Sequence, residues 1–567
     1  MKKYLPFINW LPSYKKGNFA GDFAAGITVG VMLIPQGMAY AMLAGLPPIY
    51  GLYAATIPLI IYALLGTSRQ LAVGPVAMVS LLISSGIGAL AETGTTEFIA
   101  LAILLAFMVG VIQFLMGVFK LGFLVNFLAH PVIAGFTSAA AIIIGFSQLK
   151  HILGIKIPRG HVYEIIQHAF SNINLINTPT LILGLSSIAL LLFIKKINRR
   201  IPGPVVIVVV GILAVYFLGL QDLGVKIVKD VPEGFPLFSI PAFSLSDISA
   251  LLPIALTIAF IGFLESYAVA KTLEAKHKTY QVAANQELIA LGLANIVGSF
   301  FKAFPVTGGF SRTAVNDQAG AKTGLASIIS ALLVIVTLLF LTKYFYYLPN
   351  AVLGAIIIVA VLGLINIKEA KHLWHQDKKD FWIFMSTAIA TLVIGIEEGI
   401  LLGVAISIGL LVYNVSYPHI AELGRVPKSD EYRNVKRFDN LELFDDILIF
   451  RFDAQLFFAN ADSFKKFIED KINANKEIKY IVVEASVIYN LDSTAVNMLI
   501  DLQKDLSKKC IQLYFSDVKG PVRDKLKHNG ILSKQSVEQF YLSTHDAVDG
   551  IKNKKIQNHT DFVLQTK

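Results

Sequence analysis

Long apolar runs, separated by short polar breaks, occupy most of the first 420 residues. A helix that crosses a hydrocarbon core of about 30 Å needs about 20 apolar residues. Regular runs of this kind, which predict membrane helices, lie at 98–119, 179–194, 204–220, 251–270, 325–341, 348–365, 381–396 and 400–413. Less regular runs, interrupted by Gly, Pro, Ser and Thr, lie at 22–44, 50–65, 71–90, 123–148, 288–301 and 308–319. The pattern predicts about 14 segments, several of which are not ordinary spans.

The pattern changes near residue 420. Beyond it, ranges 446–452, 478–485 and 510–515 predict strands, whereas 462–472 and 493–506 predict amphipathic helices. Strands that alternate with helices are typical of a small α/β domain. We therefore expect a cytoplasmic N-terminal segment at 1–20, a transmembrane domain at 21–418, a linker at 419–436, the α/β domain at 437–552 and a flexible tail at 553–567.

Composition and charge favour a multi-pass membrane protein. Hydrophobic residues make up 55% of the chain, charged residues 16%, and the formal net charge is +10. Short basic loops lie on the cytoplasmic side of membrane proteins, and such loops occur at 15–16, 195–200, 271–278 and 368–379. They predict a cell-membrane protein with both termini in the cytoplasm, and they explain the positive charge without nucleic acid. The basic stretch 150–168 is an exception, because the segment count assigns it to the outside.

Two of the apolar segments are broken, one in each half of the membrane region. In 71–82 (LAVGPVAMVSLL), Gly74-Pro75 can open a short helix at Val76, and in 304–320 the pair Gly308-Gly309 precedes Arg312. Broken helices in corresponding halves are typical of transporters built from inverted repeats, and their N-terminal ends favour an anion. The alternative is that the glycines only kink the helices and that Arg312 lies at an interface.

These segments also carry a resemblance to a known family. The stretch AGITVGVMLIPQGMAYAMLAGLPPIYGLY, then GTSRQLAVGPVA and GGFSRTAVNDQAGAKTG, resembles the sulfate permease (SulP) family. The C-terminal part resembles the STAS domain that these transporters carry. The resemblance implies an α-helical membrane domain of 14 segments in two inverted repeats of seven, arranged as a core and a gate. It also implies a homodimer and an anion site between the half-helices of the third and tenth segments.

The resemblance assigns substrate-binding positions in three segments. They are Gln36 and Tyr40 in the first segment, Val76 and Ala77 in the third, and Gly309, Phe310, Ser311 and Arg312 in the tenth. An amide, two hydroxyls and backbone N–H groups at the helix starts can all donate hydrogen bonds to an oxyanion. Position 309 is Gly where some relatives have Ser, so one hydroxyl is missing from the expected set.

Glu265, in the run FIGFLESYAVAK, is a second charged residue within the membrane region. A carboxylate in a low-dielectric environment can change its protonation near neutral pH, which makes Glu265 a candidate proton site. In the SulP family this acid belongs to the coupling machinery, and a neutral Glu265 would also relieve repulsion of a bound dianion. The alternative is a purely structural salt bridge with Arg312.

The remaining motifs give weaker indications of function. His372 and His375 lack further ligands for a metal, Cys510 is the only cysteine, and no phosphate-binding loop of an ATP-driven pump is present. We therefore expect no metal, no cofactor and no enzymatic activity. Ser493 follows Asp492 at the start of a predicted helix. It is either part of a simple helix cap or, by resemblance to STAS domains of other proteins, a regulatory phosphorylation site.

The sequence predicts a secondary anion transporter, most simply a proton-coupled sulfate importer in which the core moves against the gate. Sodium-coupled bicarbonate uptake, proton-coupled C4-dicarboxylate uptake and anion exchange are alternatives within the class, so Na⁺ is open as coupling ion. An anion channel is a separate alternative. An anion-sensing signalling protein is an alternative from another class. The expected partners are a small inorganic anion, the lipid bilayer, a second copy of the chain and a cytosolic partner of the STAS domain.

Overall fold

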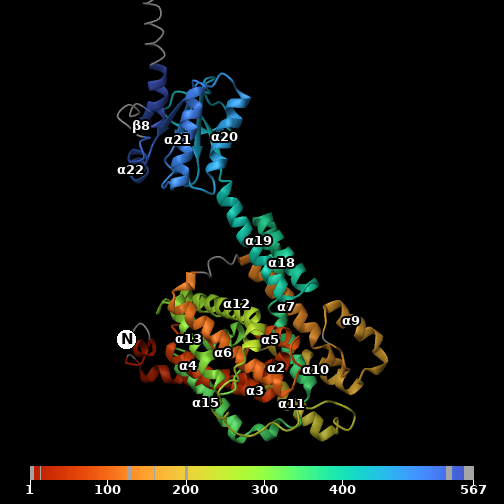
Figure 1. The fold of residues 1–567 in the computed structure, drawn as a ribbon. Helices are drawn as coiled ribbons and strands as arrows, with labels where there is room; N and C mark the ends of the chain where they lie inside the picture. The colour runs from red at the N-terminus through yellow and green to blue at the C-terminus, as the bar shows by residue number, and fades with distance from the viewer. Residues whose placement is uncertain are drawn as a thin grey trace, which may run out of the picture. The chain divides into compact units, whose positions relative to one another are not determined.

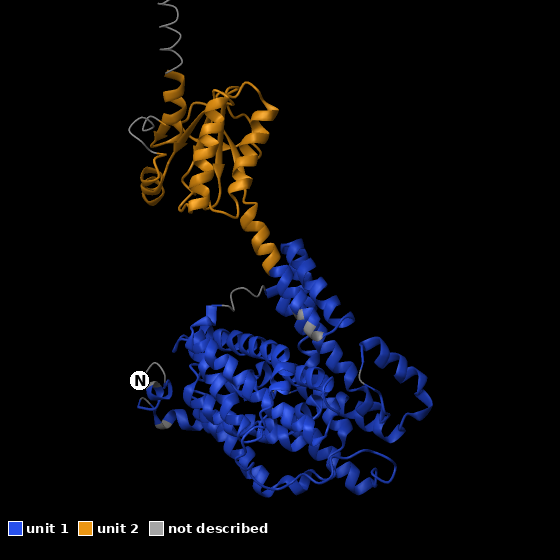
Figure 2. Cartoon of the chain, in the orientation of Figure 1, with its two compact units in different colours: residues 1–407 blue, residues 408–567 orange. Residues whose placement is uncertain are grey.

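Every apolar run predicted from the sequence contains a helix in the computed structural model of the protein. The structure describes residues 5–12, 14–123, 130–158, 160–197, 202–531 and 539–553. Arg199 and Arg200 of the predicted cytoplasmic loop, and all of the predicted tail after residue 553, lie outside this part. The chain divides into unit 1, residues 1–407, and unit 2, residues 408–567, each with its own hydrophobic core (Figure 2).

Unit 1 is built of helices (Figure 1). They are α1 Phe7–Trp10, α2 Lys16–Ala44, α3 Pro48–Tyr53, α4 Ile57–Leu65, α5 Ala77–Gly88, α6 Thr96–Val118, α7 His130–Ser147, α8 Leu149–Leu153, α9 Val162–Ser171, η2 Ile173–Leu175, α10 Thr178–Ile197, α11 Gly203–Leu218, α12 Leu245–His277, α13 Ala284–Ser299, α14 Phe310–Gln318, α15 Leu325–Phe340, η3 Thr342–Phe345, α16 Asn350–Leu362, α17 Ile367–Gln376, α18 Lys378–Val393 and α19 Ile396–Ser416, which continues into unit 2. Within the described residues, seven helical stretches are long and apolar enough to cross a membrane.

The two broken segments form short helices that follow a two-stranded pairing. β1 (Val73–Gly74) runs antiparallel to β2 (Thr307–Gly308). α5 and α14 begin directly after these strands and are 12 and 9 residues long, too short to cross a bilayer. Non-helical backbone at membrane depth must be satisfied by protein, and the pairing supplies that partner.

A close approach of two glycines fixes the packing of α2 against α3. Gly37 in α2 faces Gly51 in α3, and a Cβ built on Gly51 would lie 1.9 Å from the carbonyl oxygen of Gly37. Only residues without a side chain allow the two backbones to lie this close. Gln36 and Tyr40 flank the contact, so the packing of α3 positions both of them.

Two fully buried carboxylates join distant segments of unit 1. Asp22 accepts hydrogen bonds from the backbone N–H groups of Lys322 and Thr323, at 2.6 and 3.0 Å, and from the Thr323 hydroxyl at 2.7 Å. Glu287 accepts from the Tyr62 hydroxyl at 2.6 Å and from the Thr67 N–H at 2.7 Å. Because each carboxylate meets several donors, burial does not leave its charge unsatisfied.

Unit 2 is an α/β domain. Its strands are β3 Ile420–Arg425, β4 Tyr432–Asn434, β5 Ile447–Phe452, β6 Tyr480–Glu484, β7 Gln512–Ser516 and β8 Phe540–Tyr541, and its helices are α20 Ala461–Ala474, α21 Ser493–Lys508 and α22 Gly520–His528. The strand order is β4-β3-β5-β6-β7-β8, with β5 to β8 parallel and β3 antiparallel to both of its neighbours.

The range 419–436, predicted to be a linker, carries β3 and β4 of this sheet. Ile420, Ala421 and Glu422 pair with Phe452, Arg451 and Phe450 of β5. The sequence HIAELGR alternates apolar and charged residues over only one short stretch, and the charged residues that follow it obscure the strand signal. The sheet therefore includes two strands that precede β5 in the chain.

We predict that Gly51→Ala destabilises the protein by about 3 kcal/mol, because the new methyl group would overlap the Gly37 carbonyl and force α2 and α3 apart. Gly145→Ala is the matched control, since a Cβ at this helical position meets nothing within 4 Å. The measurement is the unfolding midpoint of the purified protein in detergent. Equal midpoints for the two variants would contradict the close approach as a constraint on the fold.

Candidate anion-binding site

The pairing of β1 with β2 places the starts of α5 and α14 next to each other. Val76 is the N-cap of α5 and Gly309 is the N-cap of α14, and neither provides a side-chain cap. The N–H groups of an uncapped first turn have no partner within the helix, and the helix end carries a partial positive charge. Two such ends at one place favour a bound anion.

Arg312, in the first turn of α14, adds a full positive charge at this place. The side chain is buried, with 2% of the residue exposed. Its Nη1 atom donates a hydrogen bond to the carbonyl oxygen of Pro75, just before α5. Its Nε and Nη2 atoms are buried and have no partner among the described residues. A buried guanidinium with unmet donors is costly, and an oxyanion would satisfy these donors.

Two glycines leave room for this guanidinium. A Cβ built on Gly309 would lie 2.9 Å from Arg312 Nη2 and 3.3 Å from Cγ1 of Val76. Gly74 has a φ of +153°, which side-chain-bearing residues rarely adopt, and a Cβ there would lie 3.3 Å from Nη2. The absence of side chains at both positions therefore lets Arg312 reach from α14 to the segment before α5.

α2 contributes an amide and a hydroxyl. Gln36 and Tyr40 lie one helical turn apart, so both side chains are on the same face of α2. Both residues are buried, with 4% and 6% of their surface exposed, and Gln36 Oε1 has no hydrogen-bond partner among the described residues. Tyr40 lies within electrostatic range of Arg312 and Glu265. The structure thus brings the residues of the first and tenth segments to one region.

Glu265 comes from α12 and completes the charged set. Its Oε2 atom is buried without a hydrogen-bond partner, and its charge acts on Arg312. No ion pair joins Glu265 to Arg312 in the part of the chain that the structure describes. The alternative of a structural salt bridge between them is therefore wrong for this conformation.

The residue after Glu265 ties α12 to the β1–β2 pairing, which sequence reasoning missed. Ser266 Oγ accepts a hydrogen bond from the Gly308 N–H at 2.7 Å and lies 2.6 Å from the Thr307 hydroxyl. The Thr307 hydroxyl also donates to the carbonyl oxygen of Gly262. Ser and Thr in apolar helices commonly bond their own backbone, so their positions alone do not reveal such a contact.

A second missed residue, Asn295 in α13, holds the backbone that leads into β2. Its side chain accepts from the Val306 N–H at 2.8 Å and donates to the Val306 carbonyl at 3.1 Å. It also donates to Gln113 Oε1 at 3.2 Å, and Gln113 donates to the Ala259 carbonyl at 3.1 Å. In the sequence, the signal for this contact is an amide side chain within each of two apolar runs, Gln113 and Asn295.

Of the remaining predicted site residues, two are buried at a helix start and two have exposed side chains. Val76 and Ala77 are buried, with 5% and 7% of their surface exposed, and they form the start of α5. Phe310 is 57% exposed and Ser311 is exposed as well. Phe310 therefore contributes its backbone position at the start of α14, and the expected hydroxyl of Ser311 is not part of the buried set around Arg312.

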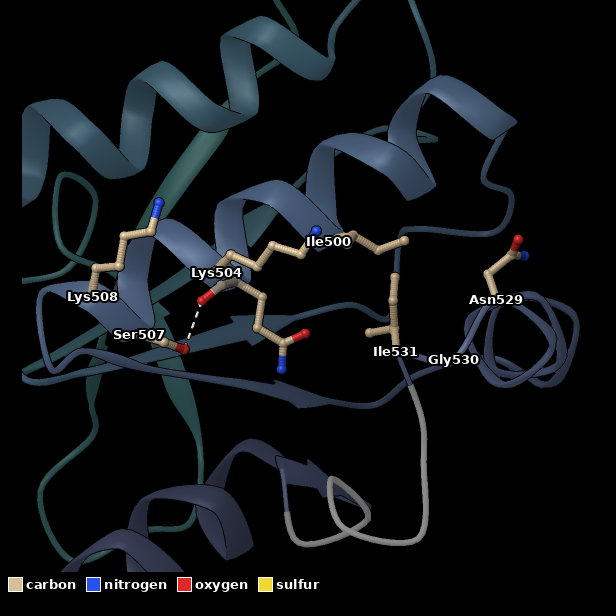
Figure 3. A pocket seen from close by; sticks show the side chains of 8 residues that line it. Ile500, Lys504, Ser507, Lys508, Asn529, Gly530 and Ile531 are labelled. Carbon is tan, nitrogen blue, oxygen red and sulfur yellow. Dashed lines mark hydrogen bonds between the residues drawn. The ribbon is translucent and has the colours of Figure 1, made fainter.

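In unit 2, Ser493 is the first residue of α21 and is exposed. Asp492 caps this helix: its Oδ1 accepts from the Ala495 N–H at 2.8 Å, and its Oδ2 accepts from the Phe458 N–H at 2.9 Å. A hollow of about 640 Å³ lies along the other end of α21, between Lys504, Lys508 and Ile531 (Figure 3). Ser493 does not line it, so the cap and the hollow are separate features.

The two histidines considered as metal ligands, His372 and His375, belong to no cluster of possible ligands among the described residues. His375, in α17, shares a hydrogen bond of 2.7 Å between its Nδ1 atom and the Lys371 carbonyl of the preceding turn. Over the described ranges, no group of three or more His, Cys, Asp or Glu side chains is arranged to hold a metal ion.

Comparisons with known proteins agree with this fold. Residues 19–387 match the model of the sulfate permease family, and residues 440–547 match the STAS domain. The chain is 39% identical to "Sulfate transporter 4.1, chloroplastic" of Arabidopsis thaliana, over 96% of this chain and 82% of that protein. It is also 39% identical to "Probable sulfate transporter 4.2" of the same plant, over 96% and 83%.

A solved structure extends the likeness to three dimensions. The murine Solute Carrier 26 family member A9 anion transporter, in the inward-facing state, superposes with a TM-score of 0.89 at 29% sequence identity. The match covers 96% of this chain and 93% of that chain. With a family model that spans more than half of the sequence, relatives aligned over nearly the whole chain and a shared fold, the chain belongs to the sulfate permease family.

Proposed function

We propose that this chain is a secondary transporter that imports sulfate together with protons. The observation that carries the proposal is the buried guanidinium of Arg312, whose Nε and Nη2 donors are unmet at the place where two uncapped helices begin. Eight curated relatives all bear names of sulfate transporters, at 33–39% identity. These names support sulfate as the substrate.

A charge balance explains why a proton would accompany sulfate. Each helix start contributes about half a positive charge, and Arg312 contributes one. A sulfate dianion bound here would leave a net charge of roughly zero if Glu265 is protonated and roughly −1 if it is ionised. An uncompensated charge is expensive in a low-dielectric site, so a sulfate-bound site favours a protonated Glu265.

The same balance separates the candidate substrates. A monoanion such as bicarbonate or chloride would leave the site roughly neutral with Glu265 ionised, so it would need no proton. A C4-dicarboxylate carries two charges, but they lie on separate groups, whereas the donors of Arg312 and the helix starts converge on one place. Sulfate, a compact dianion, therefore fits this set best.

Transport requires that the site open to each side of the membrane in turn. We assign α5, α12 and α14, joined through β1 and β2, to a core that moves as a body against the gate helices. The chain would lie in the cell membrane with both termini in the cytoplasm, and it would work as a homodimer. The STAS domain would bind a cytosolic partner, and Ser493 would be open to modification because it is exposed.

We predict that Glu265→Gln removes the pH dependence of sulfate uptake. Wild-type uptake into proteoliposomes should rise as the external solution becomes more acidic, because protonation of Glu265 favours the dianion. A permanently neutral side chain should make uptake insensitive to external pH. Glu274→Gln, a change on the same helix at a carboxylate that pairs with Lys271, is the control and should behave as wild type. A pH dependence that persists in Glu265→Gln would contradict the coupling role.

We predict that Arg312→Ala lowers sulfate uptake by about 100-fold, the equivalent of about 3 kcal/mol for a lost charge and its hydrogen bonds. Arg312→Lys keeps the charge but loses the planar donors, so uptake should fall by only about tenfold. Initial rates in proteoliposomes measure this, with Arg433→Ala in unit 2 as the control and melting temperatures to exclude misfolding. If Arg312→Ala transports sulfate as well as Arg312→Lys, the charge balance is wrong.

A further inference from the structure

A cavity of about 380 Å³ lies in unit 1, formed by residues that we have not assigned to the anion site. Its walls come from α1, from the segment between α4 and β1, and from the segment after α12. They include Trp10, Gly66, Thr67, Arg69, Thr279 and Tyr280. No aspartate or glutamate lines the cavity, and Arg69 is its one charged lining residue among the described residues.

Arg69 stacks on an aromatic ring, and no acid among the described residues forms an ion pair with it. Its guanidinium lies over the ring of Tyr280, 5.6 Å from the ring centroid. The Tyr280 hydroxyl donates a hydrogen bond of 2.7 Å to Gln70 Oε1, which fixes the ring. No carboxylate forms an ion pair with Arg69 in the described part of the chain. A stacked guanidinium keeps its planar set of donors available, which suits a phosphate or a carboxylate.

The buried acid of this region does not line the cavity and is hydrogen-bonded to other groups, although its charge reaches Tyr280. Glu287 is fully buried and does not line the cavity. Its Oε1 atom accepts from the N–H and the hydroxyl of Thr67, at 2.7 and 2.5 Å, and its Oε2 atom accepts from Tyr62. Both oxygens of the Glu287 carboxylate thus have hydrogen-bond partners outside the cavity, whereas the guanidinium of Arg69 lines it.

The cavity lies where apolar spans end. The candidate span Pro48–Leu65 ends one residue before Gly66, and the span Leu245–His277 ends two residues before Thr279. Trp10 lies seven residues before the span Gly17–Ala44, whose first turns carry the exposed side chains of Phe19 and Phe23. Span ends with tryptophan and basic residues lie at the level of lipid headgroups, where phosphate groups are abundant.

We propose that this cavity binds a phosphate-bearing anion, with the guanidinium of Arg69 as its anchor. The phosphate belongs either to the headgroup of an anionic lipid or to free inorganic phosphate. The binding itself does not depend on which anion the protein transports.

Occupancy of the cavity bears on the anion site because the segment that carries Arg69 leads directly into β1. Gln70 accepts a hydrogen bond of 2.8 Å from Asn316 of α14 through its backbone carbonyl. Two residues on, the Ala72 N–H donates to the Thr313 hydroxyl at 3.0 Å, and the Ala72 carbonyl accepts from the Gly309 N–H at 3.1 Å. A ligand that orders Arg69 therefore stabilises the strand from which both helix starts are held.

The test is ligand-dependent thermal stability of the full-length protein in detergent. Dihexanoyl phosphatidylglycerol and inorganic phosphate are added separately to wild type, Arg69→Gln and Arg433→Gln. The last is the matched control, because Arg433 also lies over an aromatic ring, that of Phe438 at 6.0 Å. At least one ligand should raise the midpoint of wild type and Arg433→Gln equally, since a ligand that binds the folded state stabilises it. With the lipid the shift should be at least fivefold smaller in Arg69→Gln, and with phosphate it should be smaller by the part that the cavity contributes.

Each outcome decides the proposal. A shift with phosphate alone identifies the free anion, and a shift with the lipid only identifies the headgroup. Binding of phosphate between α5 and α14 would raise the midpoints of all three proteins equally, so it cancels in the difference between wild type and Arg69→Gln. An equal shift in Arg69→Gln and wild type, or no shift with either ligand, overturns the proposal. If Arg69→Gln does not fold, Arg69→Lys decides: a smaller shift than in wild type supports the planar anchor, and an equal shift overturns it.

Discussion

The antiparallel pairing of β1 with β2 is the constraint on which the site depends. It joins segments more than 200 residues apart through only two residue pairs, and two helices begin within three residues of it. So short a pairing is weak alone, and side chains reinforce it: Ser266 and Asn295 bond the backbone at and before β2, and Thr313 bonds the backbone before β1. Without these contacts the helix starts would have no fixed relation to each other.

Buried polar groups of unit 1 fall into two kinds. Asp22, Glu287 and Asn295 are each met by several partners, and they join elements far apart in the chain. Arg312 and Glu265, by contrast, each keep buried polar atoms without partners. Satisfied groups stabilise a fold, whereas unmet donors and acceptors at one place cost free energy until a ligand or a proton arrives. Other buried polar atoms of unit 1, such as those of Gln148 and Thr387, also lack a partner among the described residues, so it is the position of Arg312 and Glu265 near two helix starts that singles them out.

Much of this arrangement could be predicted from the sequence, because hydrophobic length and Gly-Pro or Gly-Gly breaks have direct physical meaning. The breaks at Gly74 and Gly309 predicted both half-helices to within one residue at their starts. The supporting contacts of Ser266 and Asn295 were not predictable, because the sequence shows that a polar residue lies in an apolar run but not which group it bonds. The strands β3 and β4 were missed because charged residues surround a short alternating pattern.

The central claim is that one proton enters the site with each sulfate, because the dianion and an ionised Glu265 together leave an uncompensated charge. The most direct measurement is proton uptake on sulfate binding by the purified protein in weakly buffered detergent solution, followed with a pH-indicator dye. At a pH above neutral, where Glu265 of the empty site is ionised, about one proton should be taken up per bound sulfate, and none in Glu265→Gln. Sulfate binding without proton uptake in the wild type, or with equal uptake in Glu265→Gln, would contradict it.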